Sequence, residues 1–262
     1  MPGDPSPVLC LDIGNTTSHL GVVRRGQAEI NKSFRTRDLT LRPESVLERL
    51  RQAAPGCTAL SFSSVVPSAR EALVEIAKPL DLPLFNLTAG TSPDLEFDYR
   101  RPEEIGQDRL ANAIGVLELG PAPAVVIDLG TAVSFDVVAP PRTFIGGIIA
   151  PGLSLMTDYL HDRTALLPQL DTRSFSIEDR IGKSTYQAME IGCTLGFEGM
   201  LRGLHEQALK HLTSLTKDPI RTVVTGGSVR WFRDTWIGGL EWEPNLSLIG
   251  LAAAWNRARL TE

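Results

Sequence analysis

Residues 8–23 read VLCLDIGNTTSHLGVV and residues 125–138 read VVIDLGTAVSFDVV. Each stretch has an apolar run, an Asp-x-Gly turn and a second apolar run, which predicts a strand, a turn and a strand. At an offset of 116 residues (12 to 128) the stretches share four identities, which pair Asp12 with Asp128, Gly14 with Gly130, Ser18 with Ser134 and Val22 with Val138. Chance can produce four identities, but the shared pattern favours a duplicated chain.

The rest of the chain alternates between predicted strands and predicted helices. We expect strands at 60–66, 84–87, near 144 and at 221–224, and helices at 43–54, 68–77, 102–119, from 151, at 184–212 and from 246. Ser68 and Glu71 form a capping-box pattern at the start of the second helix. Such alternation is typical of the α/β class, and 262 residues allow one large domain or two of ordinary size. We expect two α/β halves, residues 1–119 and residues 120–262.

The composition excludes several classes of protein. Apolar residues make up 42% of the chain and charged residues 22%, which is close to the average for folded proteins. The net charge of -5 and the lack of a Lys or Arg run argue against nucleic acid as a partner. No apolar stretch reaches the ~18 residues that a membrane span needs, and residues 1–7 lack the basic region of a signal peptide. We therefore expect a cytoplasmic protein with no membrane partner.

Metal, disulfide and common nucleotide motifs are missing from the sequence. Cys10, Cys57 and Cys193 are odd in number and have no C-x-x-C spacing, which favours reduced, buried thiols. The histidines also lack the spacing of metal ligands. No G-x-G-x-x-G, Walker A, G-x-S-x-G or H-E-x-x-H pattern is present, which removes the Rossmann, P-loop, α/β-hydrolase and zincin classes.

The turn at residues 12–17 has the parts of a phosphate and cation site. Backbone amides near Gly14 and the polar side chains of residues 15–17 can hold phosphate oxygens, and the carboxylate of Asp12 can hold a hydrated metal. An ordinary hairpin uses the same residue types, so this turn alone leaves both interpretations open. The second turn at Asp128 favours the site, because two turns of a duplicated fold would face each other across a cleft and hold a nucleoside triphosphate.

Three further glycine-containing segments have more than one explanation. Residues 225–228, TGGS, suit a nucleoside lying against glycine, although Gly-Gly is also a frequent connector after a strand. Residues 146–152, GGIIAPG, are too rich in glycine for a core strand, and they either line a ligand cavity or pack tightly. One face of a long predicted helix has almost no side chains, because it consists of Gly192, Gly196, Gly199 and Gly203. Such a face favours close contact with another helix, within the chain or across a dimer.

Residues 106–109, GQDR, lie at the beginning of a predicted helix. An Asp there is usually exposed to solvent and has no further role. The glycine ahead of it allows another group to approach, and the Asp-Arg pair can offer a carboxylate base beside an anion-binding guanidinium.

Taken together, these motifs resemble the type III pantothenate kinases, a family of the acetate kinase, sugar kinase and actin superfamily. The resemblance covers nearly the whole chain and rests on motifs in the family's order: DIGNT at 12–16, SSVVP at 63–67, Tyr99 ahead of Pro102, GQDR at 106–109, DLGTA at 128–132, GGIIAPG at 146–152, IGKST at 181–185 and TGG at 225–227. It implies a duplicated actin-like (ribonuclease H-like) ATPase fold, in which two α/β halves flank a nucleotide cleft.

The resemblance also implies an activity, which is the ATP-dependent phosphorylation of pantothenate at its terminal hydroxyl, the first step of coenzyme A biosynthesis. The family requires Mg²⁺ and a monovalent cation, K⁺ or NH₄⁺, and its members are homodimers. By resemblance, Asp108 is the general base and Asp128 is the ligand of the monovalent cation. The implied ATP contacts are Asp12, Ile13, Gly14, Asn15, Thr16, Thr17, Ser18, His19 and Thr131. The implied pantothenate contacts are Tyr99, Gly106, Gln107, Asp108, Arg109 and Thr185.

The sequence departs from the common family pattern at three positions. Gln107 stands where Ala is usual, Thr17 where Asn is usual, and Ile249 where Glu is common. None of these changes removes a chemical role. Two alternatives stay open: a related phosphotransferase that acts on another hydroxyl, and a regulatory or accessory protein that keeps the ATP-binding fold without turnover.

Overall fold

The computed structural model describes residues 6–172, 175, 181–232 and 234–260. They form two compact units, each built from separate stretches of chain. The first unit contains the chain up to residue 124, residues 138–146 and the chain from residue 245, and the second contains residues 125–137 and 147–244. The sequence predicted two halves that meet at one boundary, after residue 119. That boundary stays a prediction.

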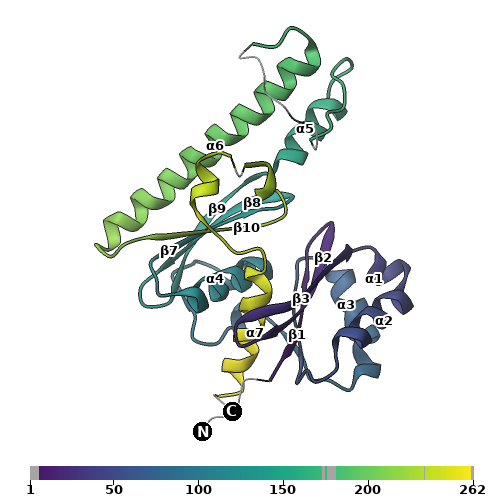
Figure 1. Cartoon of the computed structure of the whole chain (residues 1–262). Helices are drawn as coiled ribbons and strands as arrows, with labels where there is room; N and C mark the ends of the chain where they lie inside the picture. Colours follow the sequence, from purple (N-terminus) through teal and green to yellow (C-terminus); the bar gives the residue numbers. More distant parts are fainter. Residues whose placement is uncertain (1–5, 173–174, 176–180, 233, 261–262) are drawn as a thin grey trace. The chain divides into compact units, whose positions relative to one another are not determined.

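The first sheet has the strand order β3-β2-β1-β4-β5 (Figure 1). Its strands are β1 (Val8–Ile13), β2 (Thr17–Arg24), β3 (Gln27–Arg35), β4 (Leu60–Ser64) and β5 (Leu84–Asn86). Neighbours in the β1-β2-β3 meander are antiparallel, whereas β4 runs parallel to both β1 and β5. As a result, the carboxyl ends of β1 and β4 meet at one edge of the sheet.

The helices of the first unit are α1 (Asp38–Leu41), α2 (Pro43–Ala53), α3 (Pro67–Ala77), α4 (Gln107–Leu119) and α7 (Leu246–Ala258). Side chains of α2 and α3, such as Leu50 and Leu73, are buried in one hydrophobic cluster with the apolar residues of β1. Helices α4 and α7 pack closely because glycines replace side chains at their contact: a Cβ atom on Gly115 or Gly250 would overlap backbone atoms of the other helix.

The second sheet has the order β11-β10-β7-β8-β9-β6. Its strands are β6 (Glu96–Phe97), β7 (Ala124–Leu129), β8 (Ala132–Ala139), β9 (Thr143–Pro151), β10 (Arg221–Thr225) and β11 (Glu241–Trp242). Apart from β6, this is the order of the first sheet. Strands β7, β8, β9 and β10 have 6, 8, 9 and 5 residues, the same lengths as β1, β2, β3 and β4. The α/β architecture and its duplication are confirmed.

The second unit also contains α5 (Leu153–Asp162) and α6 (Thr185–Leu215), the long green helix of Figure 1. The buried face of α6 holds Phe197, whose ring lies 5.2 Å from that of Phe232. Short 3-10 helices cover Lys78–Leu80, Ala89–Thr91, Pro102–Glu104, Val229–Phe232 and Trp236–Gly239.

Two local expectations were wrong, and two stretches of strand were not expected. Strand β3 was not expected, because its sequence QAEINKSFR has too few apolar residues to alternate clearly. The helix expected over 102–119 is a 3-10 turn followed by α4 from Gln107. Residues 146–151 belong to β9, whose outer half is largely exposed and so tolerates glycine. Ser68 caps nothing, because Pro67 takes the first helical position of α3 and Val66 its N-cap.

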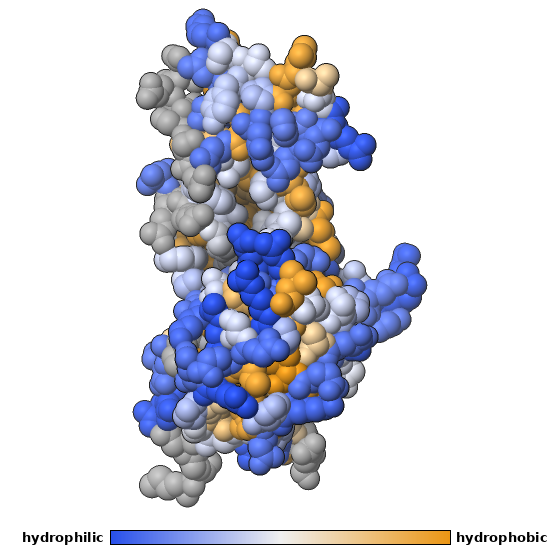
Figure 2. Space-filling model, turned by 90° about the vertical axis from the view of Figure 1, so that its right-hand side faces the viewer, coloured by the Kyte–Doolittle hydropathy of each residue, from blue (hydrophilic) through white to orange (hydrophobic). Residues whose placement is uncertain are grey.

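The surface and the cysteines fit the composition. Hydrophobic residues lie between hydrophilic ones on the face shown in Figure 2, as on most folded proteins. Within the described residues, no helix is both long enough and apolar enough to cross a membrane. The three cysteines are free and buried, as expected. Burial raises the pKa of Cys57 to about 11, which keeps this thiol protonated and unreactive.

Candidate active site

The turn between β1 and β2 is tightly closed. The backbone N–H of Gly14 donates to Thr17 O at 3.2 Å, and a Cβ atom on Gly14 would stand 2.9 Å from the same oxygen. Thr36, at the end of the neighbouring strand, donates its hydroxyl to Gly14 O at 2.6 Å and its backbone N–H to Thr16 O at 3.0 Å. The buried Ser18 hydroxyl lies 3.0 Å from that of Thr36. The backbone of this turn is therefore fixed before any ligand binds.

The carboxylate of Asp12 is oriented by the neighbouring strand. Asp12 and Ser63 face each other in the parallel register of β1 and β4, and the fully buried Ser63 donates its hydroxyl to Asp12 Oδ1 at 2.7 Å. Among the described residues, no Lys or Arg forms an ion pair with Asp12. The partly exposed carboxylate keeps acceptor capacity, which suits a hydrated cation.

The first turn of α4 presents Asp108 beside the end of β4. The side chain of Gln107 accepts a hydrogen bond from the backbone N–H of Ser64 at 2.7 Å. Asp108 Oδ1 accepts from the backbone N–H of Arg109 at 2.8 Å. A Cβ atom on Gly106 would stand 2.6 Å from Asp108 Oδ1, so a side chain there would displace the carboxylate.

Tyr99 and Arg109 share one aromatic neighbour, the fully buried Phe144. The ring centroid of Tyr99 lies 6.0 Å from that of Phe144, and the guanidinium carbon of Arg109 lies 5.4 Å from the same ring centroid. Gly146, at φ +121°, places its Cα so that a Cβ atom would be 3.8 Å from the Tyr99 ring. Tyr99 and Arg109 therefore pack against one aromatic ring of the first unit, and Gly146 lies against the ring of Tyr99.

The turn after β7 is also closed by a glycine backbone hydrogen bond, and two further glycines pack against it. Gly130 N donates to Ala132 O at 3.2 Å, and Gly152 N donates to Thr131 O at 3.0 Å. Gly226, at φ +95°, lies against the turn from the other direction: a Cβ atom there would stand 2.6 Å from Asp128 Oδ1. Gly152 and residues 226–228 therefore pack against the Asp128 turn, within the second unit.

The structure gathers the predicted site residues in two groups. The first unit holds the segment from Asp12 to His19, Tyr99 and the segment from Gly106 to Arg109, while the second holds Asp128, Thr131 and Thr185. His19 is exposed on β2, and Thr185 is the exposed first residue of α6, whose N-cap Ser184 accepts from Gln187 N at 3.2 Å. That the two Asp turns face each other across a cleft stays a prediction.

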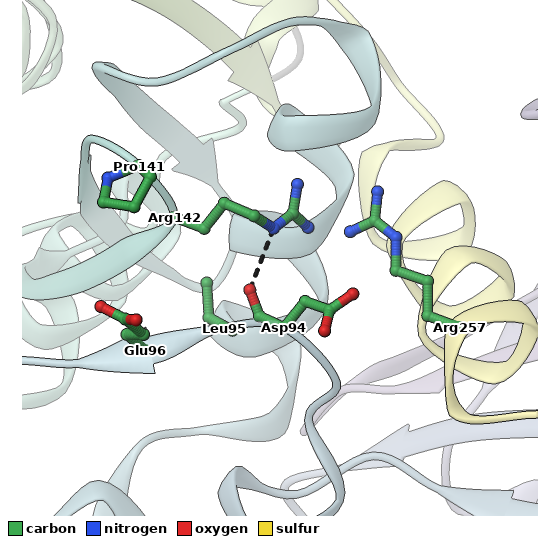
Figure 3. Close-up of a pocket in the computed structure, with 6 residues that line it drawn as sticks. All are labelled: Asp94, Leu95, Glu96, Pro141, Arg142 and Arg257. Atoms are coloured by element: carbon green, nitrogen blue, oxygen red, sulfur yellow. Dashed lines mark hydrogen bonds between the residues drawn. The ribbon is translucent and has the colours of Figure 1, made fainter. Parts of the chain in front are cut away.

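A separate polar pocket of about 510 Å³ lies in the first unit and contains none of the predicted site residues (Figure 3). The side chains of Arg142 and Arg257 extend into it, and Arg142 Nε donates to Asp94 O at 2.9 Å. Arg257 also pairs with Glu118. Because two acidic residues, Asp94 and Glu96, line the pocket together with the two arginines, its charges balance, and it is not a strong anion site.

Sequence reasoning gave no role to three residues that support the site: Thr36, Ser63 and Phe144. Ser63 lies in the quoted SSVVP motif, and its position at the end of a strand was the available signal. Thr36 follows a strand that was not expected, so nothing in the local pattern could indicate it. Phe144 is apolar within a strand, where a core role is the ordinary interpretation.

Within the described ranges, no group of three or more His, Cys, Asp or Glu side chains could hold a metal by itself. Magnesium in phosphoryl-transfer sites is commonly held by one or two carboxylates together with substrate phosphates and water. A single oriented carboxylate such as that of Asp12 fits this mode.

A family model and similar sequences point to the same protein family. Residues 8–207 match the family model described as type III pantothenate kinase. A type III pantothenate kinase of Methylacidiphilum infernorum is 36% identical over 223 residues, which cover 85% of this chain and 78% of that protein. One from Rhodospirillum centenum is 35% identical over 239 residues, 87% of this chain and 89% of that protein. In fold, the chain is similar to the ethanolamine utilization protein EutJ from Carboxydothermus hydrogenoformans, with a TM-score of 0.52, 14% identity, and 97% and 91% of the two chains covered.

Proposed function

We propose, from the premise that this chain belongs to the type III pantothenate kinase family, that it transfers the terminal phosphoryl group of ATP to the terminal hydroxyl of pantothenate. The product is 4'-phosphopantothenate, and the reaction is the first step of coenzyme A biosynthesis. One observation of this structure supports the proposal most. A fixed turn with an oriented carboxylate, at Asp12, lies in the same unit as a second carboxylate, that of Asp108, which accepts a hydrogen bond from the backbone N–H of Arg109.

We assign the residues by chemistry. The segment from Asp12 to His19, together with Thr131, contacts ATP, because closed turns offer backbone amides and hydroxyls to phosphate oxygens. The segment from Gly106 to Arg109, with Tyr99 and Thr185, contacts pantothenate. Arg109 is the partner for the pantothenate carboxylate, since a guanidinium held over an aromatic ring keeps its charge and its planar donors aligned.

Asp108 takes the role of general base. Phosphoryl transfer passes through a loose transition state, so the protein does not need to form covalent bonds to the substrate. Positioning of the reactants and neutralisation of charge supply most of the catalysis. The acceptor hydroxyl must still lose a proton, and a carboxylate at the start of a helix can receive it. Gly106 gives Asp108 the clearance to adopt its observed position.

Two cations complete the proposal. Mg²⁺, when bound, neutralises charge on the ATP phosphates, and Asp12 is the residue that would hold it. We assign Asp128 to a monovalent cation, K⁺ or NH₄⁺, whose charge would support the same phosphates. The Ser63 hydroxyl orients the Asp12 carboxylate, and the lack of a side chain at Gly226 leaves space for the Asp128 carboxylate.

We further propose a cytoplasmic homodimer. The glycine face of α6 is not covered: nothing in the described chain lies within 4 Å of the Cβ positions of Gly192, Gly196, Gly199 and Gly203. The contact within the chain, which the sequence left open, is therefore absent at these positions. Buried residues such as Phe197 and Leu201 occupy the other side of the helix, so the glycine face is available to a second copy.

A coupled assay of ADP release tests the function. The purified chain is incubated with ATP, Mg²⁺ and K⁺, with and without pantothenate, and we expect ADP release only with pantothenate. Release with a different hydroxyl substrate alone would indicate a related phosphotransferase. ATP binding without release under every condition would indicate an accessory protein.

A further inference from the structure

We propose that Gln107 is a positioning residue for the base Asp108, a role that rests on the proposed kinase function. The side-chain amide of Gln107 makes a hydrogen bond that an alanine at this position could not make. Its partner and its place in the fold indicate what that contact does.

The contact joins the end of β4 to the start of α4. Gln107 Oε1 accepts a hydrogen bond from the backbone N–H of Ser64, the last residue of β4, at 2.7 Å. Gln107 is the first residue of α4, immediately before Asp108. Ser64 is only partly exposed, so its N–H would lose most of its access to water and would need this acceptor. This hydrogen bond attaches the first turn of α4 to the end of β4.

The same strand end also holds Asp12. Ser63, the residue before Ser64, is fully buried and donates its hydroxyl to Asp12 Oδ1 at 2.7 Å. Ser64 itself is fixed by its hydroxyl, which donates to Val66 O at 3.0 Å. Two adjacent residues of one strand therefore connect the carboxylate assigned to the ATP side with the turn that carries the base.

This connection predicts how Gln107 acts on the reaction. Asp108 has to accept a proton from the hydroxyl that attacks ATP, and ATP is assigned to the Asp12 turn. The distance between Asp108 and that turn should therefore affect the transition state more than substrate binding. Without the Gln107 contact, the first turn of α4 loses this hydrogen bond to β4, and the Asp108 carboxylate can shift relative to the Asp12 turn. The loss should appear in kcat, while the KM for ATP stays the same.

The test compares two substitutions of matched size. Gln107→Met keeps the length and the helix-forming tendency of the side chain but removes the acceptor, and Gln107→Glu keeps an acceptor oxygen. We expect Gln107→Met to lower kcat by about 3- to 100-fold, the range between the loss of one hydrogen bond and a misplacement of about 1 Å. Gln107→Glu should retain more of kcat than Gln107→Met, because its carboxylate oxygen can still accept from the Ser64 N–H. Gln52→Met, on the exposed face of α2 where Gln52 bonds only to Glu48, is the control and should leave kcat unchanged.

The outcomes separate this role from its alternatives. Wild-type kcat in Gln107→Met overturns it, and so does a loss confined to the KM for pantothenate, which would make Gln107 a binding residue only. Equal losses in the Met and Glu variants, with a lowered unfolding midpoint in both, would show a purely structural role. If the wild type itself releases no ADP with pantothenate, the proposed function fails, and the role of Gln107 fails with it.

Discussion

Gly226 and Asp128 are in such close contact that a Cβ atom on the glycine would stand 2.6 Å from Asp128 Oδ1, and as near to Leu129 N. The glycine also has a φ of +95°, a conformation that residues with side chains rarely adopt. The carboxylate assigned to the monovalent cation can therefore occupy its observed position only because residue 226 has no side chain.

Replacing Gly226 with alanine should lower the free energy of unfolding by about 1 to 3 kcal/mol, because both backbone strain and the overlap with the turn oppose it. Chemical denaturation measures the change. Gly227→Ala is the matched control, since a Cβ atom at Gly227 meets nothing within 4 Å. Equal midpoints for the two variants would contradict the close approach.

Activity should depend on the identity of the monovalent cation. We expect turnover to fall sharply when K⁺ is replaced by Na⁺ or Li⁺, and Asp128→Asn to lower kcat in K⁺ by about 10²-fold, as when one electrostatic stabiliser is removed. The variant should also lose its preference among the three salts. Equal wild-type rates in all three would remove this role from Asp128.

Asp108→Asn should lower kcat by about 10²- to 10⁴-fold, the usual contribution of a positioned base. The amide keeps the shape of the side chain but cannot take a proton, so ATP and pantothenate should still bind with their wild-type dissociation constants. Steady-state kinetics and calorimetric titration measure the two effects. A kcat near that of the wild type would place the base elsewhere.

Arg109→Ala should raise the KM for pantothenate by about 10- to 100-fold, because a hydrogen-bonded contact to an anion is lost in the ground state. Arg109→Lys should give an intermediate value, since it keeps the charge but not the planar group held over Phe144. A change in kcat alone, with an unchanged KM, would argue against carboxylate binding by this residue.

Sedimentation should show a dimer of about twice 28.5 kDa at micromolar concentration. Gly199→Leu should shift the chain toward monomer without lowering its unfolding midpoint as a monomer, because nothing in the described chain lies near that position. Gln52→Leu on the exposed face of α2 is the control and should leave the dimer intact. An active wild-type monomer would contradict the homodimer.

The sequence predicted the parts of the fold that periodicity and glycine turns encode. The Asp12 and Asp128 turns, α2, α6 and β10 lie close to their expected positions, because apolar spacing and turn residues decide them locally. Strand β3 is polar and lies at the edge of the sheet beside β2. Its formation therefore depends on pairing with β2 and not on a pattern in its own sequence.

The site was predictable only as a set of residue types. Motif order indicated Asp12, Asp108 and Arg109, but not the contacts that hold them. The hydroxyl of Ser63 on Asp12, and the amide of Gln107 on Ser64, depend on which way a side chain points and on which strand lies beside it. Both are consequences of tertiary structure, and spacing along the chain does not contain them.

The two duplicated turns are supported by different contacts, and they should therefore respond differently to substitution. At the first turn, the Thr36 hydroxyl donates to Gly14 O, so a substitution at Thr36 removes a hydrogen bond and need not add atoms to the turn. At the second turn, Gly152 and Gly226 lie so close that an added side chain collides with it. A side chain added at Gly152 or Gly226 should therefore disturb the Asp128 turn more than the loss of the Thr36 hydroxyl disturbs the Asp12 turn.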